Sequence, residues 1–212
     1  MQATALKLPE NLHEDELFWM PGTWDDYLEI LDEADQTAPT LTIQFLNNEI
    51  IMSQASAPHE ELVMTIGWLL KTALLSQRQY RVLGSSIKIM IPDHDGDFNA
   101  DVSVVKAPIE YGTTPAGKLT NMRIANPEIV VEVLSKSTRK FDEIEKSAYY
   151  KRISSLQHIL LVDQYKPYAS VFSRTETPGQ WLNQDYWSLD DVVRLGGIEL
   201  PMRDIYNDIL SE

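Results

Sequence analysis

The sequence predicts a mixed α/β domain in which one central sheet lies between helices. Residues 129–134 form a dense apolar run of strand length, and residues 57–75 repeat apolar side chains at helical spacing. Short β-branched segments alternate with polar turns elsewhere. Hydrophobic residues make up 43% of the 212 residues, which is enough for one domain with a sizeable core. We therefore expect a single domain over residues 1–212, with an irregular lead-in over residues 1–21.

The apolar run IVVEVL predicts the central strand of that sheet. Side chains alternate between the two faces of a strand, and both faces are apolar here, as in a strand covered on both sides. Glu132 would then lie among buried side chains, where a carboxylate needs a cationic partner, a proton or a bound metal. Two interpretations stay open: a structural pair with an Arg or Lys, or a catalytic or metal-binding role. One face carries Ile129, Val131 and Val133, and the other carries Val130, Glu132 and Leu134.

The segments before this strand predict a helix, a β-hairpin and a second helix. Thr23, with Asp26 three residues later, is typical of a helix N-cap before WDDYLEILDEAD. Asn47 and Asn48 separate two apolar runs and predict a hairpin turn, because Asn tolerates a positive φ. Ser56 predicts the N-cap of the second helix. The first helix and the hairpin would form an N-terminal extension of the core.

The remaining segments predict further strands and one more helix. We expect strands in YRVL, SSIKIMIP, NADVSVV, HILLVD and YASVFSR, a polar loop in DHDGDFN, and a long loop over residues 106–127. A charged helix is expected over residues 142–153, with Asp142 and Glu145 as a capping pair. The segment GGIELPMRDIYNDIL predicts a terminal helix.

Charge is distributed unevenly along the chain. The net charge is −14, which argues against a nucleic-acid partner. Residues 1–61 hold 13 acids and one base, and residues 175–212 hold 8 acids and 2 bases, whereas residues 62–174 hold 15 bases and 11 acids. An acidic rim around a basic middle can still receive a phosphate backbone locally, although the basic residues could equally form an ordinary solvated surface.

Composition also bears on compartment and cofactors. The chain has no cysteine, which excludes disulfides, thiolate metal sites and cysteine catalysis. No apolar run reaches membrane-span length, and the first residues lack the pattern of a signal peptide, so we expect a cytoplasmic protein without membrane contact.

Two motifs resemble ligand sites and fail on detail. The stretch GTTPAGK has the spacing of a phosphate-binding loop, but Leu119 follows its lysine and Pro115 removes an amide that such a loop uses. We therefore expect no nucleotide cofactor. Asp93, Asp95 and Asp97 resemble the start of a calcium loop without its glycine and glutamate, so we expect a solvated turn there.

Asp101 and Glu132 remain, on two successive buried strands. If these strands pair, both carboxylates can reach one hard cation, because neighbouring strands lie about 4.8 Å apart. One or two protein carboxylates, with waters and substrate phosphates, are typical of magnesium sites. The following helix offers Lys146, with Tyr150 one turn on, and a lysine there could stabilise developing charge. We expect Mg²⁺ as the cofactor, with Mn²⁺ as a substitute.

The segments ADVSVV, PEIVVEVLSKSTRKFDEIEKSAYY and HILLVD resemble the Uma-two family of restriction endonucleases, within the PD-(D/E)XK nuclease superfamily. The resemblance covers roughly residues 22–206. It implies a restriction-endonuclease-like core, a mixed sheet flanked by helices, and Mg²⁺-dependent hydrolysis of DNA phosphodiester bonds. It places the metal-binding Asp on Asp101 and the Glu on Glu132. The usual lysine position falls on Leu134, which directs that role to Lys146, with Lys88 as a weaker substitute.

Auxiliary roles and alternative functions stay open at this stage. His59 and Glu60 begin the second helix, where Glu60 also suits the helix dipole, and both are auxiliary site candidates with Lys88 and Tyr150. Gln44 stands where the family's early hairpin often carries Glu. A catalytically silent nuclease-fold protein with acidic surfaces is the main alternative to an endonuclease, and a different phosphohydrolase is a third reading. We expect DNA as the substrate and a homodimer as the assembly.

Overall fold

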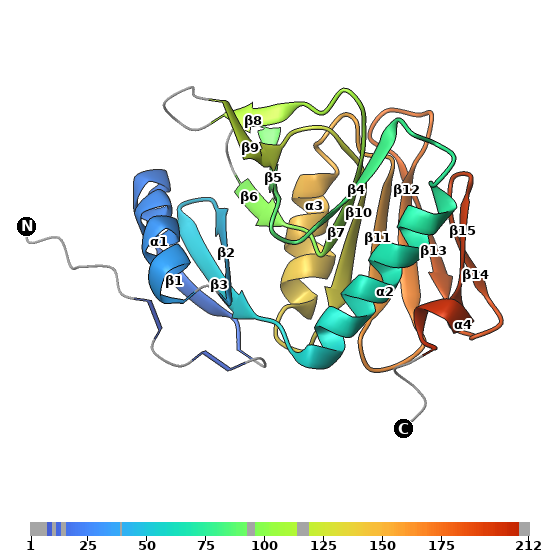
Figure 1. The fold of residues 1–212 in the computed structure, drawn as a ribbon, viewed down its shortest axis with the longest axis horizontal. Helices are drawn as coiled ribbons and strands as arrows, with labels where there is room; N and C mark the ends of the chain where they lie inside the picture. The colour runs from blue at the N-terminus through green and yellow to red at the C-terminus, as the bar shows by residue number, and fades with distance from the viewer. Residues whose placement is uncertain are drawn as a thin grey trace, which may run out of the picture.

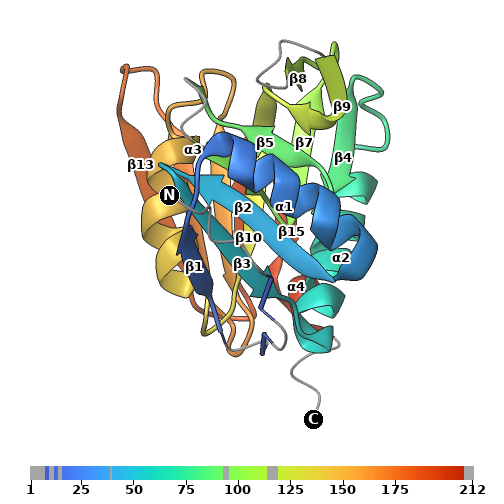
Figure 2. The same ribbon diagram turned by 90° about the vertical axis from the view of Figure 1, so that its left-hand side faces the viewer.

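The computed structural model describes residues 8–9, 12–13, 16–38, 40–92, 96–113 and 119–207. The elements stack in layers, seen from two directions in Figures 1 and 2. Helix α1 (Trp24–Thr37) covers one face of a seven-stranded sheet, and a six-stranded sheet lies beyond it. Helix α3 (Ser147–Tyr150) lies between the two sheets, and helix α2 (Ala57–Ala73) covers the far face of the six-stranded sheet.

The seven-stranded sheet has the order β1-β3-β2-β6-β5-β9-β8, with β5 and β9 parallel and its other pairs antiparallel. The turn of the β2–β3 hairpin is made by Asn47 and Asn48, whose φ angles of 50° and 63° confirm the prediction. Its strands are β1 (Phe18–Pro21), β2 (Leu41–Leu46), β3 (Glu49–Gln54), β5 (Lys88–Met90), β6 (Gly96–Asn99), β8 (Tyr111–Thr113) and β9 (Leu119–Ile124).

The six-stranded sheet has the order β13-β12-β11-β10-β7-β4. Its centre is β10 (Pro127–Leu134), which pairs antiparallel with β7 (Val102–Lys106) and parallel with β11 (His158–Asp163). The predicted central strand is therefore confirmed. The other strands are β4 (Tyr80–Gly84), β12 (Ala169–Arg174) and β13 (Trp181–Tyr186); a separate hairpin of β14 (Val192–Leu195) and β15 (Ile198–Pro201) leads into the short helix α4 (Met202–Ile205).

The two faces of β10 belong to different hydrophobic cores. Ile129, Val131 and Val133 pack with α2 and the C-terminal hairpin, whereas Val130 and Leu134 pack with α3 and the seven-stranded sheet. This is the alternation that the sequence predicts. Glu132 consequently faces the α3 side, buried between the two sheets.

Both long helices begin where the sequence predicts. Thr23 and Asp26 form a capping box at α1, since the Asp26 amide donates to the Thr23 hydroxyl and the Thr23 amide donates to the Asp26 carboxylate. The Ser56 hydroxyl accepts from the backbone N–H of His59 at the start of α2. The cap at Ser56 matters for the site, because it fixes where His59 enters the cleft described below.

Five local predictions are wrong. Residues 18–21 form β1 instead of an irregular lead-in, because Phe18 to Pro21 pair along the edge of β3. The predicted long loop contains β8 and β9, and GDFN is the strand β6. The expected terminal helix begins as the strand β15, and in its described part only the single turn of α4 is helical. The expected capping pair of Asp142 and Glu145 does not form, since helical structure already begins at residue 139.

The polar motifs have mixed outcomes. Asp97 is fully buried, so the expected solvated turn is wrong at this residue; Asp93 and Asp95 lie outside the described residues, as do residues 114–118 of GTTPAGK. No helix in the described part of the chain is long and apolar enough to span a membrane.

Candidate active site

A cleft of about 220 Å³ opens beside the segment that joins β3 to α2. Figure 1 shows this segment in the lower middle of the molecule. Asp101, Glu132 and Lys146 all line the cleft, together with His59. The three predicted catalytic residues therefore share one cleft. Asp101 reaches it because it immediately precedes β7, which pairs with β10 in a register that sets Val102 opposite Val131.

Asp101 is held at both carboxylate oxygens. Its Oδ2 accepts the backbone N–H of Val133 at 2.6 Å, and its Oδ1 lies 3.2 Å from Nε2 of His59. Burial acts to raise the pKa of Asp101, but His59, the ammonium of Lys146 and the Val133 N–H outweigh it, so the pKa lies below the ordinary value. The same contact raises the pKa of His59 against the opposing effect of burial. Asp101 is thus an oriented carboxylate that stays ionised.

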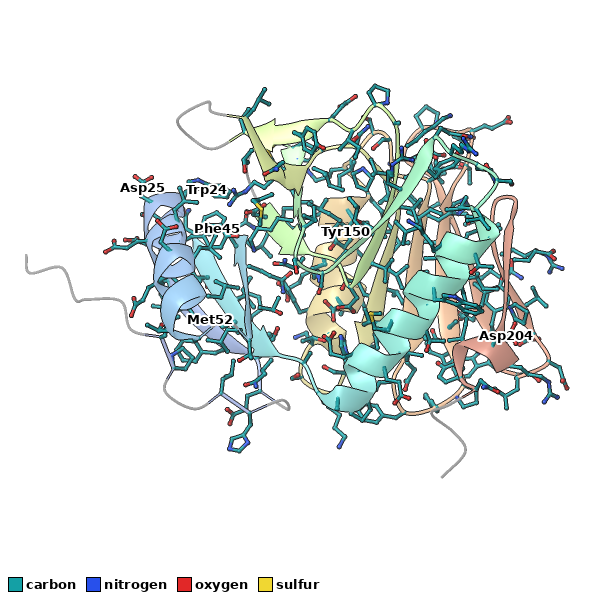
Figure 3. All side chains as sticks on the ribbon, in the orientation of Figure 1. Trp24, Asp25, Phe45, Met52, Tyr150 and Asp204 are labelled. Atoms are coloured by element: carbon teal, nitrogen blue, oxygen red, sulfur yellow. The ribbon has the colours of Figure 1, made fainter. Side chains whose placement is uncertain are left out.

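Lys146 lies at the centre of a buried cluster of acceptors. Its Nζ is 2.7 Å from Oε1 of Glu132, 3.1 Å from Oδ1 of Asp142 and 2.9 Å from the backbone oxygen of Asn99. The hydroxyl of Tyr150 donates to the same Glu132 oxygen at 2.7 Å. Figure 3 labels Tyr150 in the middle of the molecule, on the helix between the two sheets. The three ammonium protons of Lys146 therefore match three protein acceptors.

The ammonium of Lys146 pairs with two carboxylates, and this sharing shifts the pKa values of the cluster. Burial raises the pKa of Glu132 well above its ordinary value; Lys146 opposes the shift, whereas Asp142 and Asp101 add to it. Burial likewise raises the pKa of Asp142 despite Lys146. The pKa of Lys146 is raised, because the surrounding acids outweigh the burial of its charge. The cluster thus favours a charged lysine and a proton retained among the carboxylates.

The helix that carries Lys146 departs from α-helical geometry at this point. Residues Phe141–Lys146 (η2) are π-helical, and Ser147 donates both its N–H and its hydroxyl to the carbonyl of Asp142. Such π-turns insert one extra residue into a helix and occur frequently at functional sites. Here the π-turn holds both Asp142 and Lys146 in the buried space against β10.

The auxiliary candidates differ in their places. His59 and Tyr150 contact Asp101 and Glu132 directly, and Glu60 lines the cleft as an exposed side chain. Lys88 is connected through Asn99, since its Nζ donates to the Asn99 side chain at 2.8 Å while the Asn99 carbonyl accepts from Lys146. Leu134 is buried in the core, so the structure gives it no polar role.

Four residues of the site were missed from sequence. Asp142, predicted as a helix cap, is a buried partner of Lys146; their i, i+4 spacing on a helix was the available signal. The sequence predicts no contact for Gln44, yet its side chain accepts the N–H of Asn99 at 3.1 Å. The Asn99 carbonyl and the Gln164 side chain carry no sequence signal, because both depend on tertiary placement.

The donor set suits a hard divalent cation in kind. Asp101 and Glu132 supply carboxylate oxygens, the ligands that Mg²⁺ prefers, and both line the cleft. In the described part of the chain, no three His, Asp or Glu side chains are arranged to hold a metal ion. A magnesium site normally completes its shell with waters and substrate phosphates, so two carboxylates suffice for a fit.

Comparison with known proteins agrees with this architecture. Residues 24–203 match the Uma2 family, described as "Putative restriction endonuclease". The chain belongs to this family. An uncharacterized protein of Synechocystis sp. (strain ATCC 27184 / PCC 6803 / Kazusa), sll1609, is 30% identical over 141 residues, which cover 66% of this chain and 73% of that protein.

The fold also recurs in a solved structure. The crystal structure described as a putative nuclease belonging to DUF820, from Anabaena variabilis ATCC 29413, superposes with a TM-score of 0.69 at 16% identity. The match covers 90% of this chain and 100% of that one. The predicted mixed α/β, restriction-endonuclease-like fold and the Uma2 membership are thus confirmed.

Proposed function

We propose that this protein is a divalent-cation-dependent endonuclease that hydrolyses DNA phosphodiester bonds in the Asp101–Glu132 cleft. The observation that carries the proposal is that Asp101, Glu132 and Lys146 line one cleft. The chain belongs to a family described as "Putative restriction endonuclease". The excess of buried acids over cations supports the proposal, since an uncompensated cluster of carboxylates is a natural place for a metal ion.

Asp101 and Glu132 would hold Mg²⁺, or Mn²⁺ in its place. Bound there, the ion would lower the pKa of a coordinated water and neutralise charge on the phosphoryl oxygens. Asp101 is aimed by the Val133 N–H and by His59, so it needs little reorganisation to act as a ligand. Tyr150 fixes the Glu132 carboxylate through its hydroxyl.

Lys146 would stabilise the negative charge that develops on the phosphate or on the attacking water. To do so it must release one of its three acceptors. The contact with Asp142, at 3.1 Å, is the longest of the three and is the one we expect it to give up. Asp142 would then act as a resting partner that keeps the ammonium charged and in place.

The silent-protein alternative has one observation in its favour. Lys146 is satisfied entirely by protein acceptors, as a structural lysine would be. Under that reading Glu132 and Lys146 form a buried ion pair, and no substrate is hydrolysed at any cation concentration.

A cleavage assay separates the two functions. Supercoiled plasmid and linear duplex DNA are incubated with Mg²⁺ or Mn²⁺ and with wild type, Asp101→Asn or Glu132→Gln. We expect each variant to lose activity by on the order of 100-fold or more, since even the partners of metal ligands contribute about 10- to 100-fold. Asp204→Asn, an exposed acid on α4, is the matched control and should cleave like wild type. Absence of cation-dependent cleavage by wild type would favour the silent protein.

A homodimer is part of the proposal, because cutting both strands of a duplex is simplest with two active sites. Sedimentation at micromolar concentration would show a single species of twice the chain mass, and a monomer would remove this part.

A further inference from the structure

We propose that the N-terminus of α2, with Gln164 and Lys136, binds a second backbone phosphate of the DNA strand, adjacent to the phosphate that is hydrolysed. The inference rests on the proposed function, since it says how the same cleft holds its substrate. All of these groups line the cleft that contains Asp101 and Glu132.

The start of α2 points into the cleft. Ser56, Pro58 and His59 line it, and the first N–H groups of a helix lack partners within the helix. The hydroxyl of Ser56 meets the His59 N–H at 3.4 Å, a long hydrogen bond that leaves this donor weakly satisfied. The dipole of this 17-residue helix adds partial positive charge at the same place. A helix start alone does not make a site, and Gln164 supplies an independent observation.

Gln164 lines the cleft, and its buried side chain carries one unmatched polar atom. It is 6% exposed, its Nε2 lies 3.0 Å from the Ser56 hydroxyl, and its Oε1 is buried without a hydrogen-bond partner among the described residues. A buried polar atom left unpaired is destabilising. A ligand that hydrogen-bonds to Gln164 beside the start of α2 would therefore remove this unfavourable state.

The amide can supply the donor that a phosphate needs. The oxygen and nitrogen of a carboxamide occupy nearly equivalent positions, so a half-turn exchanges them. In the proposed state the Ser56 hydroxyl would donate to Oε1, and the NH₂ group would take the unpartnered position and be free to donate to an anion at the start of α2. A phosphate oxygen would then complete the hydrogen bonding of Gln164.

The rim adds a full charge and an aromatic face. Lys136 follows β10, is exposed, and holds its Nζ 5.3 Å from the centre of the Tyr165 ring. Tyr165 is 47% exposed, and its ring holds the Lys136 ammonium at the rim through this cation–π contact. Glu60 lines the same cleft and opposes an anion there, which makes its charge a second test of the site.

DNA affinity in EDTA tests the site without hydrolysis. Fluorescence anisotropy of a labelled duplex of about 12 base pairs is measured with wild type, Gln164→Met and Gln164→Glu. We expect a Kd about 10-fold higher for Gln164→Met, since a hydrogen bond to a charged group is lost, and a larger loss for Gln164→Glu. Gln184→Met, on the exposed edge strand β13, is the matched control with unchanged Kd. Thermal unfolding should show Gln164→Met at least as stable as wild type, because no unpaired oxygen is left.

Charge variants locate the phosphate. Lys136→Ala should reduce the slope of log K against log salt by about 0.9, the value for one duplex phosphate contact. Lys71→Ala, in the last turn of α2, should leave the slope unchanged. Glu60→Gln should tighten binding several-fold.

Three results would overturn the proposal. The first is that wild type does not bind DNA. The second is that Gln164→Met binds DNA as tightly as wild type, as it would if Gln164 held only a water. The third is that inorganic phosphate protects the protein from thermal unfolding although the protein does not bind DNA. Binding that follows the predicted pattern without any cleavage would instead overturn the endonuclease while leaving the phosphate site in place.

Discussion

Two buried acid clusters lie on opposite sides of the seven-stranded sheet and are balanced differently. In the first, Asp97 on β6 meets Nε of Arg123 at 2.8 Å and the hydroxyl of Tyr27 at 2.8 Å. In the second, Glu132 meets Lys146 at 2.7 Å and the hydroxyl of Tyr150 at 2.7 Å. Each has one carboxylate, one cation and one tyrosine. The second cluster, however, also draws in further acids.

The excess of carboxylates over cations distinguishes the candidate site from a structural ion pair. Asp97 and Arg123 match one charge to one charge, and the side chain of Asp97 is fully buried, away from the cleft. Around Lys146 the carboxylates of Asp142 and Asp101 join that of Glu132, and this group lines the cleft. Repulsion among these carboxylates does not stabilise the fold, whereas a cation bound in the cleft would relieve it.

The largest expected difference lies in stability after loss of the central charge. Asp97→Asn should lower the free energy of unfolding by about 3–5 kcal/mol, because it leaves the buried guanidinium of Arg123 uncompensated. Glu132→Gln should lower it by less than about 1 kcal/mol in EDTA, because Lys146 keeps Asp142 and one repulsion is removed. Urea denaturation of both variants measures the difference. Equal losses would mean that the Glu132 cluster is an ordinary structural pair.

The second difference is in pH dependence. The raised pKa of Glu132 means that its contribution to stability is fully present below the ordinary value of 4.5 and is lost as pH rises through the folded-state pKa. Wild type should therefore lose stability relative to Glu132→Gln as pH increases. Asp101 has a lowered pKa and the opposite sign: its contribution is present above 3.8 and is lost as pH falls through the folded-state value.

Urea unfolding in EDTA between pH 3 and pH 8, with Glu132→Gln and Asp101→Asn, checks both signs. A constant stability difference between wild type and Glu132→Gln across this range would mean that the pKa of Glu132 is not raised by burial and by the neighbouring acids.

The smallest difference concerns the tyrosines. Tyr27→Phe should lower the free energy of unfolding by about 1.5–3 kcal/mol, since one Asp97 oxygen already lacks a partner and the other keeps only Arg123 among the contacts described. Tyr150→Phe should lower it by about 1 kcal/mol, because Glu132 retains Lys146 and can hold a proton. Calorimetric unfolding of the two variants compares them at matched volume loss. A larger effect at Tyr150 would reverse the ranking of the two clusters.

Local patterns predicted the parts of the fold that local chemistry determines. The Asn47–Asn48 turn, the Thr23 and Ser56 caps and the alternation along β10 all rest on neighbouring residues, and the structure has each of them. Successive short strands commonly pair, and the pairing of β7 with β10 brings Asp101 and Glu132 to one cleft.

What the sequence did not predict depends on distant partners. The stretch GDFN looks polar and loop-like, yet Asp97 is buried because Arg123 and Tyr27, from β9 and α1, meet it there. The residue pattern predicts Asp142 as a capping residue, because the π-turn that directs its side chain inward is not visible in that pattern. Gln164 becomes a candidate residue only through its contact with Ser56, the N-cap of α2, and tertiary packing brings these two residues together.

Calorimetric titration of Mg²⁺ and Mn²⁺ shows whether the Asp101–Glu132 cleft binds a divalent cation. Wild type is compared with Asp101→Asn at modest salt, with and without a DNA duplex, because substrate phosphates can complete the ion's shell. We expect saturable binding by wild type that disappears in Asp101→Asn, and binding with DNA present at least as tight as without it. Absence of binding by wild type under both conditions, or unchanged binding by the variant, would mean that these carboxylates do not hold the ion.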